Sequence, residues 1–200
     1  MSEHYYTENP NTKSNPETWE ARLDNRTFRF TSDSGVFSKE KVDFGSQLLI
    51  ESVDLSSFPE GDLLDVGCGY GPMGLALALK DTNRTVEMVD VNTRALELAQ
   101  KNAEANKISN VTIYSSNIYD AVEKKGFAGV FSNPPIRAGK KVVHQILEEA
   151  YNHLKSGGYL TIVIQKKQGA PSAKKKMEEV FDNVERIAHD KGYWILQSKK

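Results

Sequence analysis

The chain has 200 residues, of which 38% are hydrophobic and 26% charged, and its formal net charge is −1. This length allows one domain with a sizeable core, and no apolar run reaches the ~20 residues of a membrane-spanning helix, so we expect no membrane association. The single cysteine, Cys68, excludes an internal disulfide and any zinc site built from several cysteines.

The start of the chain is polar and rich in turn-forming residues. Residues 1–30 include several acidic side chains and have the pattern of neither a signal peptide nor a basic transit peptide, so we expect a cytoplasmic protein. We interpret residues 1–26 as an N-terminal extension that docks loosely on a single domain, residues 27–200.

Beyond residue 60 the apolar pattern alternates between strand-like and helix-like periods. Strands are predicted at 62–66, 85–90, 111–114, 126–132, 159–164, 184–188 and 193–197, and helices at 72–80, 93–106, 141–154 and 172–181. The short connection between the last two strands cannot hold a crossover helix, so these strands must run antiparallel. The prediction is an α/β, Rossmann-like fold with a seven-stranded, mostly parallel sheet, one antiparallel strand and helices on both faces.

A glycine-rich loop follows the first of these strands and opens a helix. Gly67, Gly69 and Gly71 allow a sharp turn and a close approach of a ligand to the backbone. Asp65, just before them, adds negative charge that repels a pyrophosphate but attracts the ammonium and sulfonium groups of S-adenosylmethionine. The loop therefore favours S-adenosylmethionine over a dinucleotide; the alternative is a purely structural turn.

Two polar residues at the ends of later strands extend this predicted cofactor site. Asp90 lies about 20 residues beyond the loop, where a carboxylate can accept both ribose hydroxyls; alternatively it caps the following helix, a role that Asn92 could fill. Asn117 follows the third strand, where an amide could recognise the adenine amine, in competition with neighbouring polar side chains. The predicted cofactor-binding residues are Asp65, Val66, Gly67, Cys68, Gly69, Asp90, Val91, Asn117, Ile118 and Asn133.

The run Asn133-Pro134-Pro135-Ile136 follows the fourth strand and is the predicted catalytic motif. Two prolines stiffen the loop, so that its carbonyls and the Asn133 amide oxygen can receive the hydrogens of a planar amino group. Methyl transfer from a sulfonium is an in-line displacement, for which such alignment provides much of the catalysis without a metal or covalent intermediate. Ile136 offers an apolar face to a ring. The alternative is an ordinary turn at a strand end.

Charge is distributed unevenly along the chain. Residues 134–200 hold 13 Lys+Arg against 7 Asp+Glu, a net charge of +6, whereas the remainder carries −7. Arg137, Lys140 and Lys141 directly follow the catalytic motif and are predicted to contact the phosphates of an RNA substrate. The alternative is that lysines such as those at 174–176 only cover a solvated helix face. His144 and His153 lack partners at ligand spacing, so we expect no metal site.

These motifs resemble the class I methyltransferases that methylate amino groups through an Asn-Pro-Pro-aromatic motif. Upstream, the sequences GVFS (35–38) and DFGSQLL (43–49) are similar to the segment before the catalytic domain of the ribosomal small-subunit guanine-amine methyltransferases. The resemblance covers about residues 27–200 and implies a class I methyltransferase domain that acts on guanine in small-subunit ribosomal RNA. It places both segments over the cofactor and the mouth of the active site, with Phe37 against the substrate and Ser46 and Gln47 as further candidates for cofactor contact.

Two departures from the family keep alternatives open. Ile136 stands where relatives usually have an aromatic residue, and Arg137 stands where a histidine is common. We also expect no degenerate second methyltransferase half like that of well-known members, so substrate docking would depend on the basic half of the chain, on a homodimer or on a different RNA. The alternatives are methylation of a protein glutamine amide or of a small molecule, and an inactive cofactor-binding module that binds RNA. The intact Asn-Pro-Pro motif speaks against the last of these.

Overall fold

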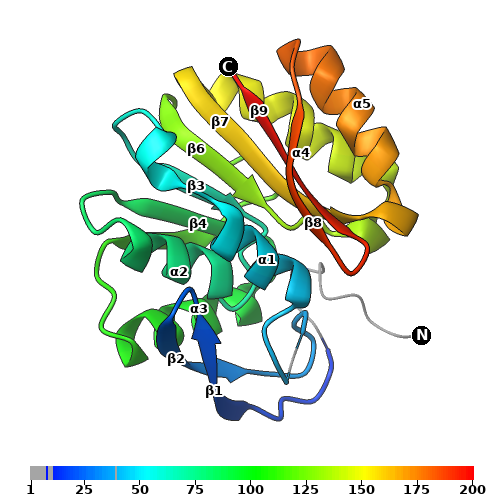
Figure 1. The fold of residues 1–200 in the computed structure, drawn as a ribbon. Helices are drawn as coiled ribbons and strands as arrows, with labels where there is room; N and C mark the ends of the chain where they lie inside the picture. Colours follow the sequence, from blue (N-terminus) through cyan, green and yellow to red (C-terminus); the bar gives the residue numbers. More distant parts are fainter. Residues whose placement is uncertain (1–7, 9–10, 39) are drawn as a thin grey trace.

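The computed structural model describes residues 8, 11–38 and 40–200; the rest of the predicted N-terminal extension lies outside these residues. A seven-stranded sheet forms the centre of the molecule (Figure 1), with strand order β5-β4-β3-β6-β7-β9-β8. All neighbouring strands are parallel except β9, which runs antiparallel to both β7 and β8. The strands are β3 (Leu63–Val66), β4 (Val86–Asp90), β5 (Val111–Ser115), β6 (Phe127–Ser132), β7 (Leu154–Gln165), β8 (Glu185–Asp190) and β9 (Tyr193–Lys199).

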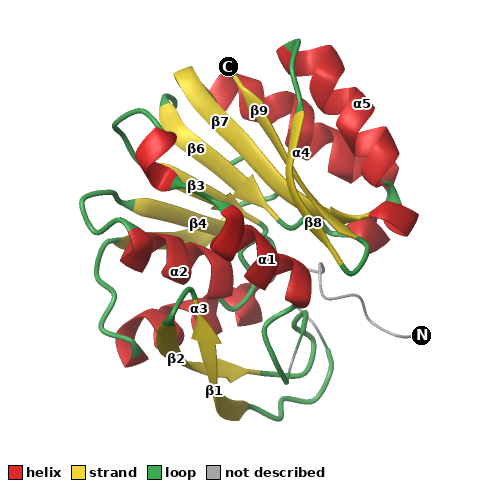
Figure 2. Ribbon diagram, viewed as in Figure 1, coloured by secondary structure: helices red, strands yellow, loops and turns green. Residues whose placement is uncertain are grey.

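Helices cover both faces of the sheet (Figure 2), and each face has its own apolar core. The β3 side chains alternate between the two cores, with Leu63 in one and Leu64 in the other, as expected for a strand buried on both faces. The fold class predicted from the sequence is confirmed. One face carries α1 (Phe44–Ser52), α2 (Pro72–Lys80) and α3 (Thr93–Ala105), and the other carries α4 (Lys140–His153) and α5 (Ala170–Phe181).

Three features differ from the predicted elements, and the first is α1, which is not among the helices predicted from the sequence. The glycine-containing stretch 155–158 is not a loop between helix and strand: β7 begins at Leu154, directly after α4, and the stretch forms an irregularity in its pairing with β6. Part of the predicted extension forms a hairpin of β1 (Glu17–Leu23) and β2 (Arg26–Ser32), so the predicted boundary after residue 26 falls inside the hairpin. Its two-residue turn has positive φ angles of 46° and 62°, which suit the twist of a hairpin.

The hairpin packs on α3, which brings it close to the glycine-rich loop. The buried Asn102 side chain accepts a hydrogen bond from the Thr31 amide (2.7 Å) and donates to the carbonyls of Thr31 and Tyr70 (both 2.9 Å). β1 and β2 alternate between exposed and more buried side chains on either side of the Asp24-Asn25 turn, and this local pattern is typical of a hairpin. No helix in the described part of the chain is long and apolar enough to cross a membrane.

Candidate active site

A cavity of about 540 Å³ lies at the carboxyl ends of β3, β4, β6 and β7. It brings together the whole predicted cofactor set, from Asp65 to Asn133, with the four residues of the catalytic motif. Phe37 and Arg137 also line it. Lys140 and Lys141 do not: they are exposed in the first turn of α4, in a separate shallow depression with His144.

The glycine-rich loop forms one wall of this cavity. Gly67, Gly69 and Gly71 have φ angles of 76°, 57° and 101°, in the left-handed region that favours glycine. The amides of Gly67 and Cys68 donate to the Val89 carbonyl (2.8 and 2.9 Å), which holds the loop against the end of β4. A Cβ atom added at Gly67 or Gly69 would meet no described atom within 4 Å, so a ligand can lie directly against the backbone here.

Asp65 lies at the floor of the cavity and is fully buried. Neither of its carboxylate oxygens has a hydrogen-bond partner of good geometry among the described residues, and the Gly74 amide is close enough only to lower the pKa of Asp65 in part. Burial, assisted by the nearby Asp90 carboxylate, raises the pKa of Asp65 from its ordinary value of 3.8 to about 8. Because a buried acceptor without a donor is costly, Asp65 fits a ligand that brings a cationic N–H group, as the ammonium group of S-adenosylmethionine would.

Asp90 ends β4 on the neighbouring side of the loop. Its Oδ2 accepts from the Gly69 amide and its Oδ1 from the Asn92 amide, both at 2.8 Å, and burial raises its pKa. Asn92, not Asp90, caps α3, since its side chain accepts from the Ala95 amide at 3.1 Å. With the capping role taken, the Asp90 carboxylate is available for a diol such as that of a ribose.

The predicted adenine end of the site follows β5. Asn117 lines the cavity, is exposed and donates to Asp120 Oδ2 at 3.1 Å, which leaves its amide oxygen available as an acceptor. Ile118 adopts a φ of 53°, which is strained for a β-branched residue. The Ser116 hydroxyl donates to the Ile118 carbonyl at 2.9 Å and accepts from the Ala121 amide at 3.0 Å, which holds this turn in place. Of the competing polar residues, only Ser116 joins Asn117 in lining the cavity.

The catalytic motif leaves β6 opposite the glycine-rich loop. Ser132 Oγ donates to the Val66 carbonyl at 2.8 Å and joins the ends of the two central strands. The Asn133 amide nitrogen donates to Asp43 Oδ2 (3.0 Å) and to Ser46 Oγ (3.1 Å). Its amide oxygen is therefore the end of the side chain that is left for a substrate. Beyond the prolines, Ile136 starts a 3-10 turn and contributes an apolar surface to the cavity.

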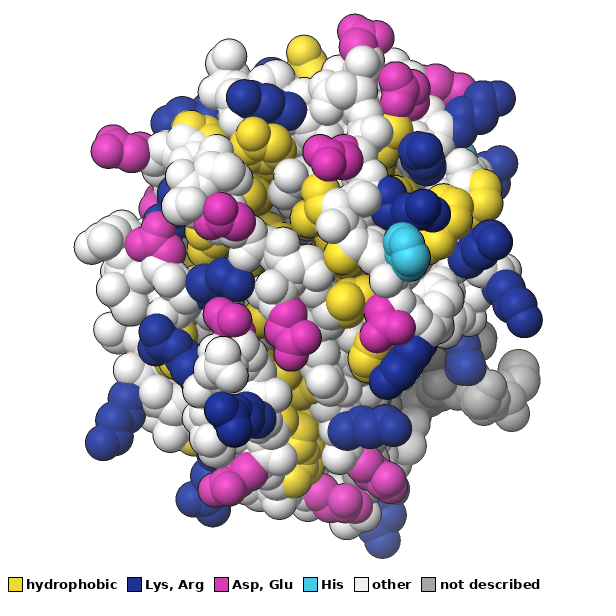
Figure 3. Space-filling model, in the orientation of Figure 1, with side chains coloured by type: hydrophobic (Ala, Val, Ile, Leu, Met, Phe, Trp, Pro, Cys, Tyr) yellow, Lys and Arg dark blue, Asp and Glu magenta, His cyan; other side chains and the backbone are white. Residues whose placement is uncertain are grey.

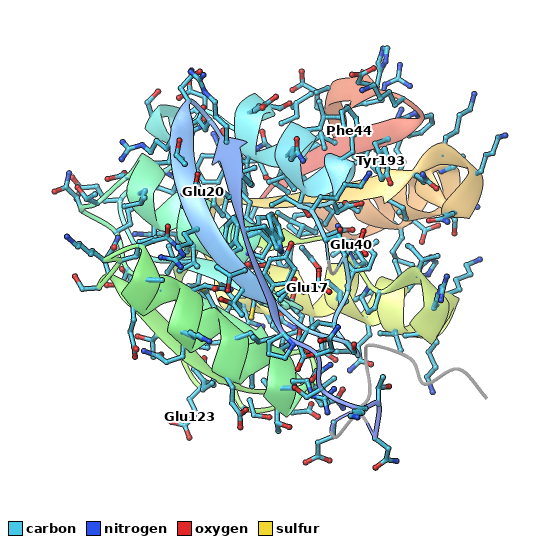
Figure 4. The ribbon with its side chains drawn as sticks, turned by 90° about the horizontal axis from the view of Figure 1, so that it is seen from below. Glu17, Glu20, Glu40, Phe44, Glu123 and Tyr193 are labelled. Carbon is cyan, nitrogen blue, oxygen red and sulfur yellow. The ribbon has the colours of Figure 1, made fainter. Side chains whose placement is uncertain are left out.

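Two residues of the site were not assigned a role from the sequence. Asp43 was noticed only as part of a motif and Tyr193 was not singled out, yet both line the cavity, as does Ser46, a predicted candidate for cofactor contact. Tyr193 comes from β9 and its hydroxyl donates to Asp43 Oδ1 at 3.4 Å. Figure 4 shows its ring beside that of Phe44, where the two rings are 5.8 Å apart. Gln47 faces elsewhere and donates to the Val42 carbonyl.

Comparison of the sequence with known proteins shows the family to which the chain belongs. The model of the methyltransferase small domain matches residues 27–197. The uncharacterised Bacillus subtilis protein YbxB is 58% identical over the full length of both chains. The ribosomal RNA small subunit methyltransferase C of Aeromonas hydrophila is 38% identical over 64% of this chain, which spans 37% of that protein.

A solved structure has the same fold over nearly the whole chain. It is the Thermus thermophilus 16S rRNA N2 G1207 methyltransferase (RsmC) in complex with AdoMet and guanosine, with a TM-score of 0.83 and 26% identity. The match covers 96% of this chain and 52% of that one, so this chain corresponds to part of the length of RsmC.

Proposed function

The chain belongs to the methyltransferase small domain family, and from this premise we propose that it methylates the exocyclic amine of a guanine in small-subunit ribosomal RNA, with S-adenosylmethionine as the methyl donor. The observation that carries the proposal is the Asn133 side chain, whose nitrogen is engaged by the protein and whose oxygen is left as an acceptor. This acceptor lies in the same cavity as the buried Asp65 carboxylate and the glycine-rich loop.

Different residues of the cavity would bind different parts of the cofactor. S-adenosylmethionine, when bound, supplies an electrophilic methyl group on a sulfonium. Asp65 would receive its ammonium group, and Asp90 would receive the ribose hydroxyls while its own bonds to the Gly69 and Asn92 amides hold it in place. The Asn117 amide oxygen would accept from the adenine amine, and Ile118 would pack against the ring.

The Asn133 amide oxygen orients the acceptor. An amine N–H of guanine would donate to this oxygen, which would direct the nitrogen lone pair at the methyl carbon. The new nitrogen–carbon bond would form as the carbon–sulfur bond breaks, with its electron pair leaving on sulfur as a neutral thioether, and the nitrogen would then release one proton to water. Ile136 and Phe37 offer apolar surface to the base; the Phe37 side chain is 40% exposed at the cavity.

Exposed lysines at the same edge of the sheet favour RNA as the carrier of the amine. Lys140 and Lys141 lie beyond the carboxyl end of β6, and Lys166 and Lys167 lie directly beyond that of β7. Figure 3 shows basic side chains gathered on the α5 and β8–β9 side of one face of the molecule. A phosphate backbone is attracted to such a surface. A ribosomal RNA substrate also implies a cytoplasmic protein, and a homodimer would enlarge the docking surface.

Methyl transfer from labelled S-adenosylmethionine tests the proposal. The protein is incubated with small ribosomal subunits, with their free RNA and with a protein extract. Asn133→Ala runs in parallel, and Asn83→Ala, an exposed residue at the opposite edge of the sheet, is the matched control. We expect label in guanine of the RNA or subunit with wild type and Asn83→Ala only. Label found only in protein would indicate a glutamine amide as the substrate instead of RNA. Cofactor binding without methyl transfer to subunits, RNA or protein would contradict the proposal.

A further inference from the structure

The start of α1 is joined to the catalytic motif by a cluster of hydrogen bonds. Asp43 precedes α1 and accepts from the Ser46 amide at 3.1 Å as its N-cap. The same oxygen, Oδ2, accepts from the Asn133 amide nitrogen, and Ser46 Oγ lies 3.1 Å from that nitrogen. Two residues from the beginning of the domain thus contact the side chain that would receive the substrate amine.

This contact determines which end of the Asn133 amide faces the cavity. An ionised carboxylate can only accept hydrogen bonds, so it stabilises the orientation with the NH₂ group toward Asp43. A flipped amide would bring its oxygen to about 3 Å from Asp43 Oδ2, with like charges facing each other and a hydrogen bond lost. Ser46 has no such preference, because its hydroxyl both donates and accepts. The orientation therefore depends on Asp43.

Asp43 is itself held from two directions. Its Oδ2 is fixed by the first turn of α1, and its Oδ1 receives the Tyr193 hydroxyl from β9. The Tyr193 ring packs beside Phe44, the first residue of α1 (Figure 4). The carboxylate is thus attached to two elements of the scaffold.

We propose that Asp43 is a positioning residue for methyl transfer: it fixes the Asn133 amide so that the oxygen, and not the NH₂ group, meets the substrate amine. The inference rests on the proposed function, because an amine substrate needs an acceptor at this point. Without Asp43, the Asn133 amide would turn its NH₂ group toward the substrate amine for part of the time. Two hydrogen-bond donors would then face each other, and no hydrogen bond could form between them.

The test separates this role from the capping of α1. Asp43→Ser keeps a good N-cap but is too short to reach Asn133. Asp43→Asn keeps both the cap and an acceptor oxygen at the position of Oδ2. Asp54→Ser is the matched control, since Asp54 caps a 3-10 turn outside the cavity and accepts from the Ser56 amide. Single-turnover methyl transfer, the Kd for S-adenosylmethionine and Tm are measured for each.

For Asp43→Ser we expect a rate about 10- to 100-fold lower than wild type, because alignment and preorganised dipoles contribute on this scale. The cofactor Kd should stay unchanged, and Tm should match that of Asp54→Ser. Asp43→Asn should keep the rate within about fivefold of wild type, since its oxygen replaces the lost acceptor. A wild-type rate in Asp43→Ser would overturn the inference. So would equal losses in both Asp43 variants, which would assign the role to the negative charge.

Two further measurements keep the inference testable. If Asp43→Ser lowers Tm more than Asp54→Ser does, the rates are compared again at a temperature at which circular dichroism shows all the variants to be fully folded. A rate of Asp43→Ser within about threefold of wild type at that temperature would overturn the inference, and a larger loss that Asp43→Asn does not share would support it.

The other measurement needs no substrate. In ¹⁵N-labelled protein the side-chain NH₂ resonances of Asn133 are identified by their absence in Asn133→Ala, and we expect Asp43→Ser to shift them and to speed their exchange with water. Unchanged resonances would reject the inference. Absence of methyl transfer by wild type would reject only the proposed function.

Discussion

A Cβ atom at Gly45 would lie 2.7 Å from Cδ1 of Tyr193, and it would lie 2.9 Å from a methyl carbon of Val163. Real Cβ atoms do not approach other atoms so closely, so the first turn of α1 can lie this near to β7 and β9 only because position 45 has no side chain. The same turn carries Asp43 and Ser46, which contact Asn133. The close approach of Gly45 to Tyr193 is therefore a condition for the geometry of the site.

Gly45→Ala should accordingly impair both stability and activity. Overpacking of this kind costs about 1–3 kcal/mol in the free energy of unfolding, and the displaced helix should lower methyl transfer more than tenfold through loss of alignment. Urea unfolding and single-turnover transfer check this. Glu51→Ala, on the exposed face of α1, is the control and should leave both unchanged. A Gly45→Ala protein with wild-type values would show that α1 can move without cost.

The buried Asp65 predicts a pH dependence of stability. Its folded-state pKa is raised to about 8, so between pH 4 and 8 the folded chain keeps a proton that the unfolded chain has lost. The free energy of unfolding of the cofactor-free protein should thus fall as pH rises through this window, by at most about 1.4 kcal/mol per pH unit from this group. Asp65→Asn removes the contribution. Urea titrations of both proteins from pH 5 to 8 measure the difference, and parallel curves would contradict it.

Cofactor binding should reverse the protonation of Asp65. A cationic ammonium group stabilises the carboxylate, so binding at pH 7 should release close to one proton, and affinity should rise with pH toward 8. Calorimetry of S-adenosylmethionine binding in buffers of different ionisation enthalpy measures this proton. Asp65→Asn should release less and should bind about 10- to 100-fold more weakly, as expected when a charge-assisted hydrogen bond is lost. Equal proton release by both proteins would exclude this role.

The exposed lysines at the start of α4 predict a salt-dependent contribution to RNA binding. Lys140→Glu combined with Lys141→Glu should raise KM for the RNA substrate about tenfold or more and flatten its dependence on salt, because fewer counterions are released. The cofactor Kd should not change, since neither side chain lines the cavity. Lys101→Glu combined with Lys107→Glu, two exposed residues near the C-terminal end of α3 at the opposite edge of the sheet, is the matched charge control. Equal losses in both double variants would indicate only a general effect of net charge.

The sequence alone determined the features that are local in the chain. From β3 onward, apolar periodicity predicted the order of the strands and helices, and the three-residue connection predicted the antiparallel pair, since both depend on neighbouring residues. The glycine-rich loop, Asp90 and the Asn-Pro-Pro motif were identified in the same way. Parallel strands bring their carboxyl ends to one edge, so these motifs were expected to meet in one cavity.

Tertiary structure alone decided how the individual side chains work. The full burial of Asp65 depends on helix packing, and the contact of Asp43 with Asn133 joins residues 90 positions apart. The approach of Tyr193 spans 150 positions. A hydrogen bond selects its partner by distance and direction in space, and a one-dimensional pattern records neither. The sequence therefore identified the residue types that do the chemistry of this site. The packing of α1 against β9 determined the direction in which the Asn133 amide points.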